Sequence, residues 1–273
     1  MVRVVVSGIC GRMGTLVARS VVAEDGLRLV GGVEQPGHDQ VGRRVCEAWG
    51  DGATDVRVAP GLDDFGKSDF DVIVDFSTPA QTVRCAEVAS RFGKGLVVGT
   101  TGLTDLQMAI VHEAAQASPV VVAPNTSIAM NLMFGLVGRA TSILGRDYDV
   151  EIVEVHHRNK KDAPSGTARQ LVSTVSEARG AGPGQTASYG RSGLSSGRAE
   201  GEIGVHSLRA GAIVGRHEIS FTSEVEELKL VHEAHSREAF ALGALRAIRY
   251  VHGREPGLYD MLDVLGLAEE RGT

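Results

Sequence analysis

The sequence predicts an α/β protein, in which a doubly wound parallel sheet is followed by a second α+β domain with a mixed, mainly antiparallel sheet. Three observations lead to this prediction. Short β-branched runs alternate with helix-length segments over the first half of the chain, as is typical of βαβ units. Beyond about residue 144, strand-like runs follow one another. The 273 residues also include 35 glycines, which suit tight turns between strands and helices.

The first domain contains five predicted strands, each short and several rich in valine, as expected for strands buried on both faces. They span residues 2–7, 27–33, 71–75, 95–99 and 119–123. A helix is predicted after the first strand, because apolar residues recur at helical spacing: Met13, Leu16, Val17 and Val21. Further helix-length segments cover 79–92 and 104–117. The segment 35–56 shows no clear periodicity and is predicted to be a surface loop.

The second domain is predicted from a helix over 127–144 and strands over 150–156, 203–209, 213–221 and 225–231. The stretch 180–201 is long and rich in Gly, Ser and Arg, and such segments are often functional. A last helix, 236–251, is expected to pack on the first domain. The predicted boundaries are therefore 1–126, completed by about 236–273, for the first domain, and 127–235 for the second.

Composition argues against several classes of protein. The net charge of −6 and the aromatic content of 4% disfavour nucleic-acid binding, which needs a concentrated basic face. No apolar run approaches the roughly 18 residues that span a bilayer, so we expect no membrane partner. Cys10, Cys46 and Cys85 are far apart, without a CxxC pair, so we expect neither a disulfide framework nor a metal site. The N-terminus leads directly into a strand without a signal segment, which favours a cytoplasmic location.

A glycine-rich turn follows the first predicted strand, where Gly8, Gly11 and Gly14 are spaced GxxGxxG. Backbone N–H groups at a helix start attract a pyrophosphate, and glycine lets it approach the main chain. Such a turn can also be purely structural. Glu34 favours binding, because it lies 20 residues after Gly14 at the end of the second strand, where a carboxylate can accept hydrogen bonds from a ribose. Together these features predict a Rossmann-like dinucleotide site.

Glu34 also bears on the choice of cofactor. A carboxylate at this position repels a 2′-phosphate, and Gln35 offers no compensating cation, so NADH is expected to be preferred. Three arginines could still approach in the folded chain and leave NADPH possible: Arg12, Arg43 and Arg44.

Two later turns, Gly99–Gly102 and Ala123–Thr126, each end a predicted strand. Ligands collect at the carboxyl ends of parallel strands, so both turns are placed to border the cofactor. Each could instead be a polar strand-to-helix turn, with Thr104 or Ser127 as the helix cap.

Side chains that can hold a proton gather after the predicted strand 150–156: His156, His157, Lys160 and Lys161. The sequence Ser165–Thr167 then opens a helix, whose N–H groups and hydroxyls can bind a carboxylate. The pattern indicates a small anionic substrate, although a solvated basic loop would have a similar composition. The remaining histidines, including His217, are expected at the surface or at the edge of the core.

These motifs resemble one family, the 4-hydroxy-tetrahydrodipicolinate (dihydrodipicolinate) reductases, over nearly the whole chain. The resemblance is carried by Gly8-x-x-Gly11-Arg12-Met13-Gly14, Asp75-Phe76-Ser77, Gly99-Thr100-Thr101-Gly102, Glu154-x-His156-His157-x-x-Lys160-x-Asp162-Ala163-Pro164-Ser165-Gly166-Thr167 and Arg209-x-Gly211-x-Ile213-Val214-Gly215-x-His217. The block from His156 to Thr167 is highly specific, since its chance occurrence after a dinucleotide fingerprint is remote.

The resemblance implies a homotetrameric oxidoreductase that uses NAD(P)H to reduce 4-hydroxy-tetrahydrodipicolinate, a small cyclic imine with two carboxylates, with loss of water, in diaminopimelate and lysine biosynthesis. The first domain would bind the dinucleotide, and the second would bind substrate and form the oligomer. His156 and Lys160 would be the catalytic acid/base pair. The substrate would be held by Thr101, His157, Lys160, Ser165, Gly166 and Thr167. The cofactor would be contacted by Gly8, Ile9, Cys10, Gly11, Arg12, Met13, Glu34, Gly99, Thr100, Thr101, Ala123, Pro124, Asn125 and Thr126.

Two residues depart from the family pattern. Thr126 replaces a usual Phe beside the cofactor, and Arg216 replaces a usual Glu in the second domain. These changes leave open a related cyclic imine reductase or an amino-acid dehydrogenase with a retuned pocket. A non-catalytic nucleotide-binding protein is a more remote alternative, because it would not need to keep Lys160 or Thr167.

Overall fold

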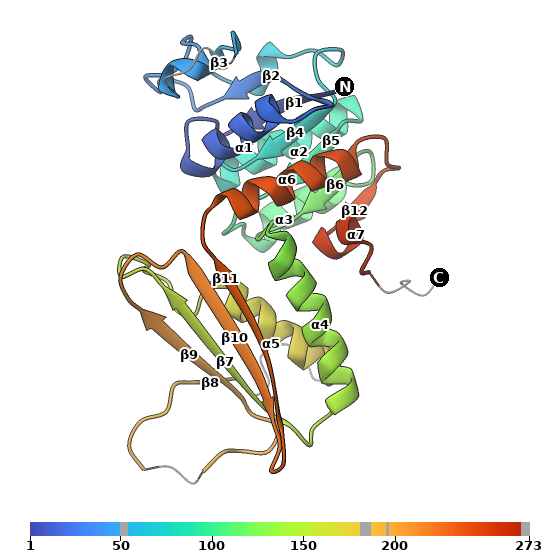
Figure 1. The fold of residues 1–273 in the computed structure, drawn as a ribbon. Coiled ribbons are helices and arrows are strands. Elements are labelled where there is room, and N and C mark those ends of the chain that lie inside the picture. Colours follow the sequence, from blue (N-terminus) through green and yellow to red (C-terminus); the bar gives the residue numbers. More distant parts are fainter. Residues whose placement is uncertain (50–53, 181–186, 195–196, 269–273) are drawn as a thin grey trace. The chain divides into compact units, whose positions relative to one another are not determined.

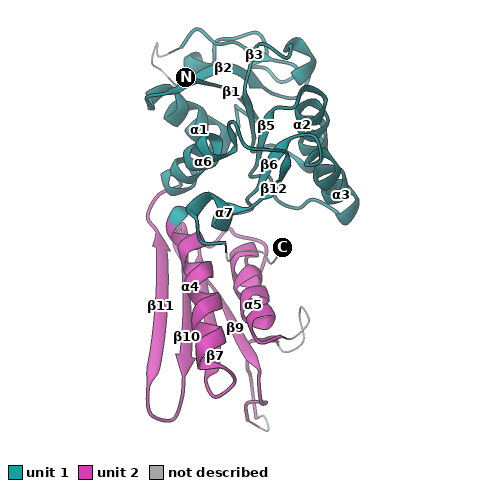
Figure 2. Cartoon of the chain, turned by 90° about the vertical axis from the view of Figure 1, so that its right-hand side faces the viewer, with its two compact units in different colours: residues 1–128, 237–273 teal, residues 129–236 magenta. Residues whose placement is uncertain are grey.

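The computed structural model describes residues 1–49, 54–180, 187–194 and 197–268. The chain forms two compact units (Figures 1 and 2). Unit 1 comprises residues 1–128 and 237–273, and unit 2 comprises residues 129–236. Within the described residues, no helix combines the length and the apolar character that a membrane span requires.

Unit 1 is built on a seven-stranded sheet in the order β12-β6-β5-β4-β1-β2-β3. Its strands are β1 (Val2–Ser7), β2 (Leu27–Val33), β3 (Val58–Ala59), β4 (Val72–Asp75), β5 (Gly95–Val98), β6 (Pro119–Val122) and β12 (Gly257–Tyr259). Its helices are α1 (Arg12–Ala23), α2 (Pro79–Phe92), α3 (Asp105–Ala114), α6 (Glu238–Val251) and α7 (Met261–Leu265), with short 3₁₀ turns η1 (Val45–Ala48) and η2 (Leu62–Asp64). All neighbouring strands in this sheet run parallel, which confirms the predicted doubly wound sheet.

Both faces of this sheet are covered by helices (Figure 2). Val4 and Val6 of β1 point to the face packed by α1 and α6, whereas Val5 points to the face packed by α2 and α3. Side chains alternate in this way along every strand, so a strand buried on both faces has no polar side. This explains the valine-rich runs of the sequence.

Two features of unit 1 were not predicted. β3 and β12 contain only two and three residues, too few for a periodic pattern, and yet they form the two edges of the sheet. The segment 35–56, predicted to be a surface loop, includes the turn η1, in which Val45 is buried against the core on the α1 side.

Unit 2 contains a five-stranded sheet in the order β11-β10-β7-β9-β8. Its elements are α4 (Ile128–Leu144), β7 (Asp149–His156), α5 (Gly166–Ala178), β8 (Ala187–Tyr189), β9 (Ile203–Arg209), β10 (Gly215–Thr222) and β11 (Glu227–Ala234). The predicted mixed sheet is confirmed. Among the described residues, β10 pairs antiparallel with β7 and β11, while β9 pairs parallel with β7 and β8. The sheet is thus evenly mixed rather than mainly antiparallel.

The parallel pair β7 and β9 follows from the chain between them, which includes α5 and so allows a crossover instead of a hairpin. The predicted long stretch 180–201 contains β8, while residues 181–186 and 195–196 lie outside the described part of the chain. Helices α4 and α5 pack on one face of the sheet, where Phe134, Leu171 and Ile152 belong to one core.

Candidate functional site

The turn between β1 and α1 depends on glycine for steric reasons. Gly8 has φ of +74°, and a Cβ there would lie 2.4 Å from the Phe76 carbonyl oxygen. A Cβ on Gly14 would lie 2.0 Å from the carbonyl oxygen of Gly8. The Gly11 N–H donates to that same oxygen at 3.0 Å. The first turn of α1 therefore packs directly against the strand end, and no side chain among the described residues caps its N-terminus.

Glu34 lies beside this turn, as the sequence predicted for a ribose-binding carboxylate. Its Oε2 accepts a hydrogen bond from the Cys10 N–H at 3.3 Å, and its Oε1 accepts one from the Gln35 N–H at 3.1 Å. Parallel pairing of β1 and β2 brings these residues together, because Ser7 and Val33 are opposite each other. The carboxylate is thus held at the mouth of the glycine turn.

The turn after β5 is fixed by a buried carboxylate. Asp75, at the end of β4, accepts hydrogen bonds from the Thr100 hydroxyl at 2.7 Å and the Thr82 hydroxyl at 2.6 Å, and from the Ser77 hydroxyl. The Ser77 N–H donates to the Thr100 hydroxyl at 2.9 Å. Because the Thr100 hydroxyl makes these hydrogen bonds within unit 1, Thr100 can contact a cofactor only through its main chain. Thr101, the next residue, is exposed.

The turn after β6 is anchored to α6. The Thr126 hydroxyl donates to the Phe240 carbonyl oxygen at 2.7 Å, and its side chain is buried. A Cβ on Gly243 would lie 1.6 Å from the Thr126 carbonyl oxygen, so α6 approaches this turn at its main chain. The residue that departs from the family pattern is thus held inside unit 1.

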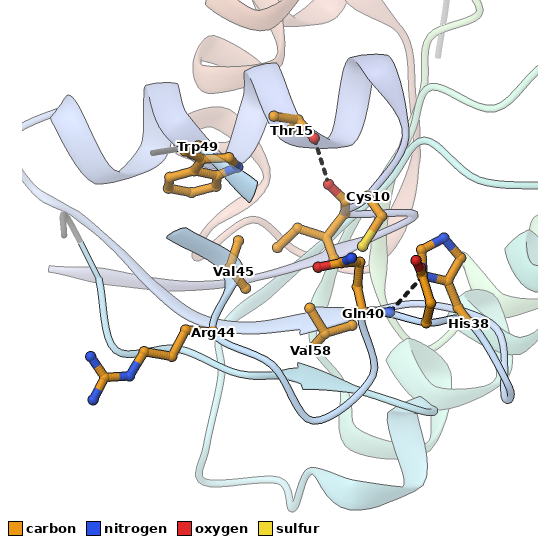
Figure 3. A pocket seen from close by; sticks show the side chains of 10 residues that line it. Cys10, Thr15, His38, Gln40, Arg44, Val45, Trp49 and Val58 are labelled. Atoms are coloured by element: carbon orange, nitrogen blue, oxygen red, sulfur yellow. Dashed lines mark hydrogen bonds and ion pairs between the residues drawn. The ribbon is translucent and has the colours of Figure 1, made fainter. Parts of the chain in front are cut away.

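All these turns lie at the carboxyl ends of the parallel strands. Strand order reverses between β1 and β4, since β2 lies on one side of β1 and β4 on the other. Ligands of open α/β sheets bind at this switch point. Next to the glycine turn is a cavity of about 230 Å³ with an apolar wall of Val45, Trp49 and Val58 (Figure 3). Arg44 also borders this cavity and pairs with Asp55 at 3.1 Å.

In unit 2, the predicted acid/base block is organised around Glu154, which is fully buried at the end of β7. Its two oxygens accept hydrogen bonds from both terminal nitrogens of Arg209 at 2.9 and 2.8 Å, from the Ser165 N–H at 3.1 Å, and share a hydrogen bond with His156 Nδ1. Glu154 thereby ties together the ends of β7 and β9 and the start of α5.

The hydrogen bonds and the burial set the charge of Glu154 and of His156. Burial favours the neutral acid at Glu154, but hydrogen bonds from Arg209, Ser207 and His156 outweigh it and hold its pKa at about 2. Burial lowers the pKa of His156, and the contact with Glu154 opposes this only in part. His156 is therefore a neutral imidazole at pH 7, with Nδ1–H directed at Glu154 and Nε2 available to exchange a proton.

Two further residues border His156. Gly215 leaves room at Nε2, because a Cβ there would lie 3.2 Å from that nitrogen. The His217 ring meets the His156 ring edge-on at 5.2 Å between centroids, and His217 Nε2 is 3.1 Å from the Ser165 hydroxyl. Burial and repulsion from His156 lower the pKa of His217 to about 3. Hence His217 is an uncharged part of the site.

The loop between β7 and α5 carries a cation beside the helix start. Lys160 Nζ pairs with both carboxylate oxygens of Asp162, at 2.8 and 2.9 Å. Ser165 is the N-cap of α5, where its hydroxyl accepts from the Ala168 N–H at 3.1 Å. Gly166, in the first turn, is exposed. A positive side chain and a helix N-terminus in one loop can hold an anion.

The structure thus groups the predicted site residues into two sets. The glycine turn, Glu34 and the turns after β5 and β6 belong to unit 1, and the block from His156 to Thr167 belongs to unit 2. Glu154, Arg209 and His217 were not assigned roles from the sequence. The expectation that His217 lies at the surface or core edge is wrong, because its side chain is buried and contacts both His156 and Ser165. The alternation of side chains along β7 could have indicated a role for Glu154, because Glu154 and His156 lie on the same buried face of the strand.

Comparison with known proteins confirms the resemblance found in the sequence. The model for the N-terminus of dihydrodipicolinate reductase matches residues 2–126, and the model for its C-terminus matches residues 129–265. The 4-hydroxy-tetrahydrodipicolinate reductase of Methanothermobacter thermautotrophicus is 43% identical over 98% of this chain and 100% of its own. That of Rubrobacter xylanophilus is 45% identical over 97% and 98%.

A solved structure shows the same architecture. The dipicolinate-bound dihydrodipicolinate reductase from Paenisporosarcina sp. TG-14 is similar with a TM-score of 0.76 and 27% identity, covering 96% of this chain and 98% of that one.

Proposed function

Because this chain belongs to the dihydrodipicolinate reductase family, we propose that it catalyses the NAD(P)H-dependent reduction of 4-hydroxy-tetrahydrodipicolinate to tetrahydrodipicolinate, with loss of water, in diaminopimelate and lysine biosynthesis. One observation carries the proposal beyond similarity. Glu154 holds both His156 and the Ser165 N–H at the start of α5, and the loop between these two residues carries the cation Lys160. These are a proton donor and an anion site, the two requirements of a dicarboxylate imine reductase.

The residues of unit 1 fit a dinucleotide. Gly8 and Gly14 let the start of α1 lie directly against the ends of β1 and β4, because a Cβ on either residue would collide with a main-chain carbonyl oxygen. The N–H groups at the start of α1 would form the main-chain cradle for the pyrophosphate. Glu34 would hold the adenosine ribose, and the wall of Val45 and Trp49 the adenine. The turns Gly99–Thr101 and Ala123–Thr126 would border the nicotinamide half. When bound, the reduced nicotinamide supplies a hydride to the substrate ring.

We propose that NADH is preferred over NADPH. The Glu34 carboxylate at the turn repels a 2′-phosphate. One candidate cation for that phosphate, Arg44, borders the same cavity but pairs with Asp55. This pair is exposed, with side-chain accessibilities of 50% and 89%, so Arg44 remains free to turn toward NADPH and a measurable rate with NADPH is expected.

The residues of unit 2 bind and protonate the substrate. The two carboxylates of the imine are held by His157 and Lys160 and by the start of α5, Ser165–Thr167, with Thr101 of unit 1 as a further predicted contact. The substrate gains an electron pair and needs a proton, which Lys160 Nζ or His156 Nε2 supplies. Negative charge on the bound dicarboxylate raises the pKa of His156 and so favours its protonated form.

We further propose a homotetramer assembled through unit 2. Helices α4 and α5 cover one face of its sheet, whereas the other face presents Leu208 and Val231, 47% and 53% exposed, among charged residues. Arg216, the second departure from the family pattern, lies on this open face and pairs with Glu218 at 2.9 Å.

We also propose a cytoplasmic location. The three cysteines, Cys10, Cys46 and Cys85, are free thiols, which fits the reducing conditions of the cytoplasm.

The test is the initial rate of NADH and of NADPH oxidation on substrate made in place from pyruvate and aspartate semialdehyde by the preceding synthase. Rapid oxidation, faster with NADH, is the expected result. Dipicolinate, which the Paenisporosarcina relative binds, should inhibit competitively with substrate. NADH binding without turnover would contradict the proposed substrate and favour a related cyclic imine.

A further inference from the structure

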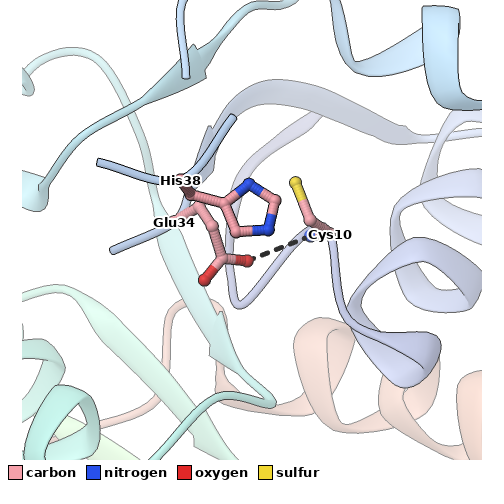
Figure 4. A group of neighbouring side chains, drawn as sticks. All are labelled: Cys10, Glu34 and His38. Atoms are coloured by element: carbon pink, nitrogen blue, oxygen red, sulfur yellow. Dashed lines mark hydrogen bonds between the residues drawn. The ribbon is translucent and has the colours of Figure 1, made fainter. Parts of the chain in front are cut away.

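Three side chains with metal-binding atoms meet beside the glycine turn of unit 1 (Figure 4). Cys10 follows β1, Glu34 follows β2, and His38 lies in the next loop. One ligand atom of each, a sulfur, a carboxylate oxygen and a ring nitrogen, lies within 4.8 Å of the other two. All three residues are partly buried.

Main-chain contacts hold the ligands in place. The Cys10 N–H donates to Glu34 Oε2 at 3.3 Å, and the Gln40 N–H donates to His38 Nδ1 at 3.2 Å. A site whose side chains are fixed in advance loses less conformational entropy when it binds an ion.

The electrostatic surroundings favour a cation. The Glu34 carboxylate lies within 4.8 Å of the ligand atoms of Cys10 and His38 and places a negative charge beside both. Asp39 Oδ1 also lies 3.2 Å from His38 Nδ1. The Asp39 carboxylate therefore adds a second negative charge next to the cluster.

We propose that Cys10, Glu34 and His38 bind a divalent transition metal of the zinc class, and that this metal and the dinucleotide exclude each other. The exclusion rests on the proposed function, in which Glu34 holds the ribose of the cofactor. A metal that takes the Glu34 carboxylate removes this hydrogen-bond acceptor and places positive charge where the ribose lies.

The donor set matches the chemistry of zinc, which takes sulfur, nitrogen and oxygen ligands in tetrahedral sites and accepts water as the fourth ligand. Binding converts the Cys10 thiol to a metal-bound thiolate and releases one proton to solvent, so affinity rises with pH. The sequence predicts no metal site because positions 10, 34 and 38 form no ligand motif. Parallel pairing of β1 and β2 creates the cluster.

The test is a Co²⁺ titration of the nucleotide-free protein, followed by the near-ultraviolet charge-transfer band of a cobalt thiolate. One Co²⁺ per chain with this band is expected. Cys10→Ser should abolish the band, while Cys46→Ser, a change at a buried thiol outside the cluster, should retain it. His38→Gln should weaken Co²⁺ binding by at least about tenfold, the loss seen even for residues behind a ligand. His112→Gln, an exposed histidine on α3, should not.

NADH should displace Co²⁺ competitively, with the apparent metal affinity falling in proportion to NADH. A missing band, or a band that survives Cys10→Ser, would overturn the metal site. Simultaneous binding of Co²⁺ and NADH would overturn the exclusion. If the metal-free protein failed to bind NADH, the proposed function would fail, and the cobalt band would still decide the metal site.

Discussion

The two candidate sites of this chain differ in the groups that form them, which are mainly main-chain groups in unit 1 and side chains in unit 2. In unit 1, the turn after β1 is shaped by the main chain, and a Cβ added at Gly8 or Gly14 would lie less than 3 Å from a main-chain oxygen. In unit 2, the site depends on side chains, where one buried carboxylate accepts hydrogen bonds from an arginine, a histidine and a main-chain N–H. The first site is therefore sensitive to added atoms, and the second to lost charge.

This difference follows from what each ligand presents. A pyrophosphate is bound by main-chain N–H groups, which every residue except proline carries, so the chain needs only to approach it closely. A substrate that must be protonated at one atom needs a side chain with a defined tautomer and charge.

Lys160→Ala is expected to have the largest effect. It should lower kcat by roughly 10²–10⁴-fold, the usual contribution of a proton donor, and leave NADH affinity unchanged because Lys160 belongs to unit 2. Stopped-flow rates and fluorescence titration with NADH would measure both. Lys161→Ala, at the exposed neighbouring position, is the matched control. Equal losses in both variants would show that the loop provides only general positive charge.

Gly14→Ala should reduce NADH affinity by roughly a hundredfold or more, because the added methyl group meets the Gly8 carbonyl oxygen and displaces the N–H cradle. Gly61→Ala serves as the control, since Gly61 has extended backbone and nothing within 4 Å of the added Cβ. Fluorescence titration and thermal unfolding would be recorded together. Normal NADH affinity in Gly14→Ala would contradict the main-chain cradle.

Glu154→Gln should lower kcat by roughly tenfold to a hundredfold, because an amide no longer fixes the Nδ1–H tautomer of His156. The acid limb of the kcat profile should also move, whereas a purely structural change would scale all rates equally. Glu177→Gln, an exposed residue of α5, should change neither. An unshifted profile in Glu154→Gln would remove Glu154 from its positioning role.

Stability should fall in acid partly through His217. Its folded-state pKa of about 3 lies below the unfolded value of 6.5, so the unfolded chain binds more protons between these values and stability is lost as pH falls through them. Replacement by Gln should reduce this loss between pH 6.5 and 5 by roughly 2 kcal/mol. Urea unfolding at several pH values would measure it, with His112→Gln as control. Parallel curves for wild type and His217→Gln would contradict the buried neutral histidine.

Thr126→Val should have the smallest effect. It removes the hydrogen bond to the Phe240 carbonyl oxygen and should lower the free energy of unfolding by about 1 kcal/mol, with little change in turnover. Urea unfolding and the steady-state rate would be compared. A large change in substrate preference would instead place Thr126 at the pocket.

The sequence predicted unit 1 closely because its signals are local. Valine runs, a glycine turn and an acidic residue 20 positions later each reflect the constraint of one strand or turn. β12 was missed, since three residues carry no period and its pairing with β6 depends on chain more than 130 positions away. The hydrogen bond that anchors Thr126 could not be predicted either, because its partner Phe240 comes from α6, more than 100 positions along the chain.

For unit 2 the sequence predicted the reactive residues but not the buried residues that hold them in place. His156 and Lys160 stand in one recognisable block. Arg209 reaches Glu154 only because β9 pairs parallel with β7, opposite to the mainly antiparallel sheet that was predicted. His217 enters the site through the register of β10, in which it lies opposite Glu154. Such contacts depend on strand pairing, which local patterns leave undefined.

The central claim, that unit 1 binds the cofactor and unit 2 the substrate, is tested most directly by hydrogen–deuterium exchange of the wild-type protein with each ligand. NADH alone should protect peptides covering Gly8–Gly14, Gly99–Gly102 and Ala123–Thr126 and leave 156–167 unchanged. Dipicolinate added to the NADH complex should then protect 156–167. Protection of 156–167 by NADH, with 8–14 exchanging as in the free protein, would contradict the account.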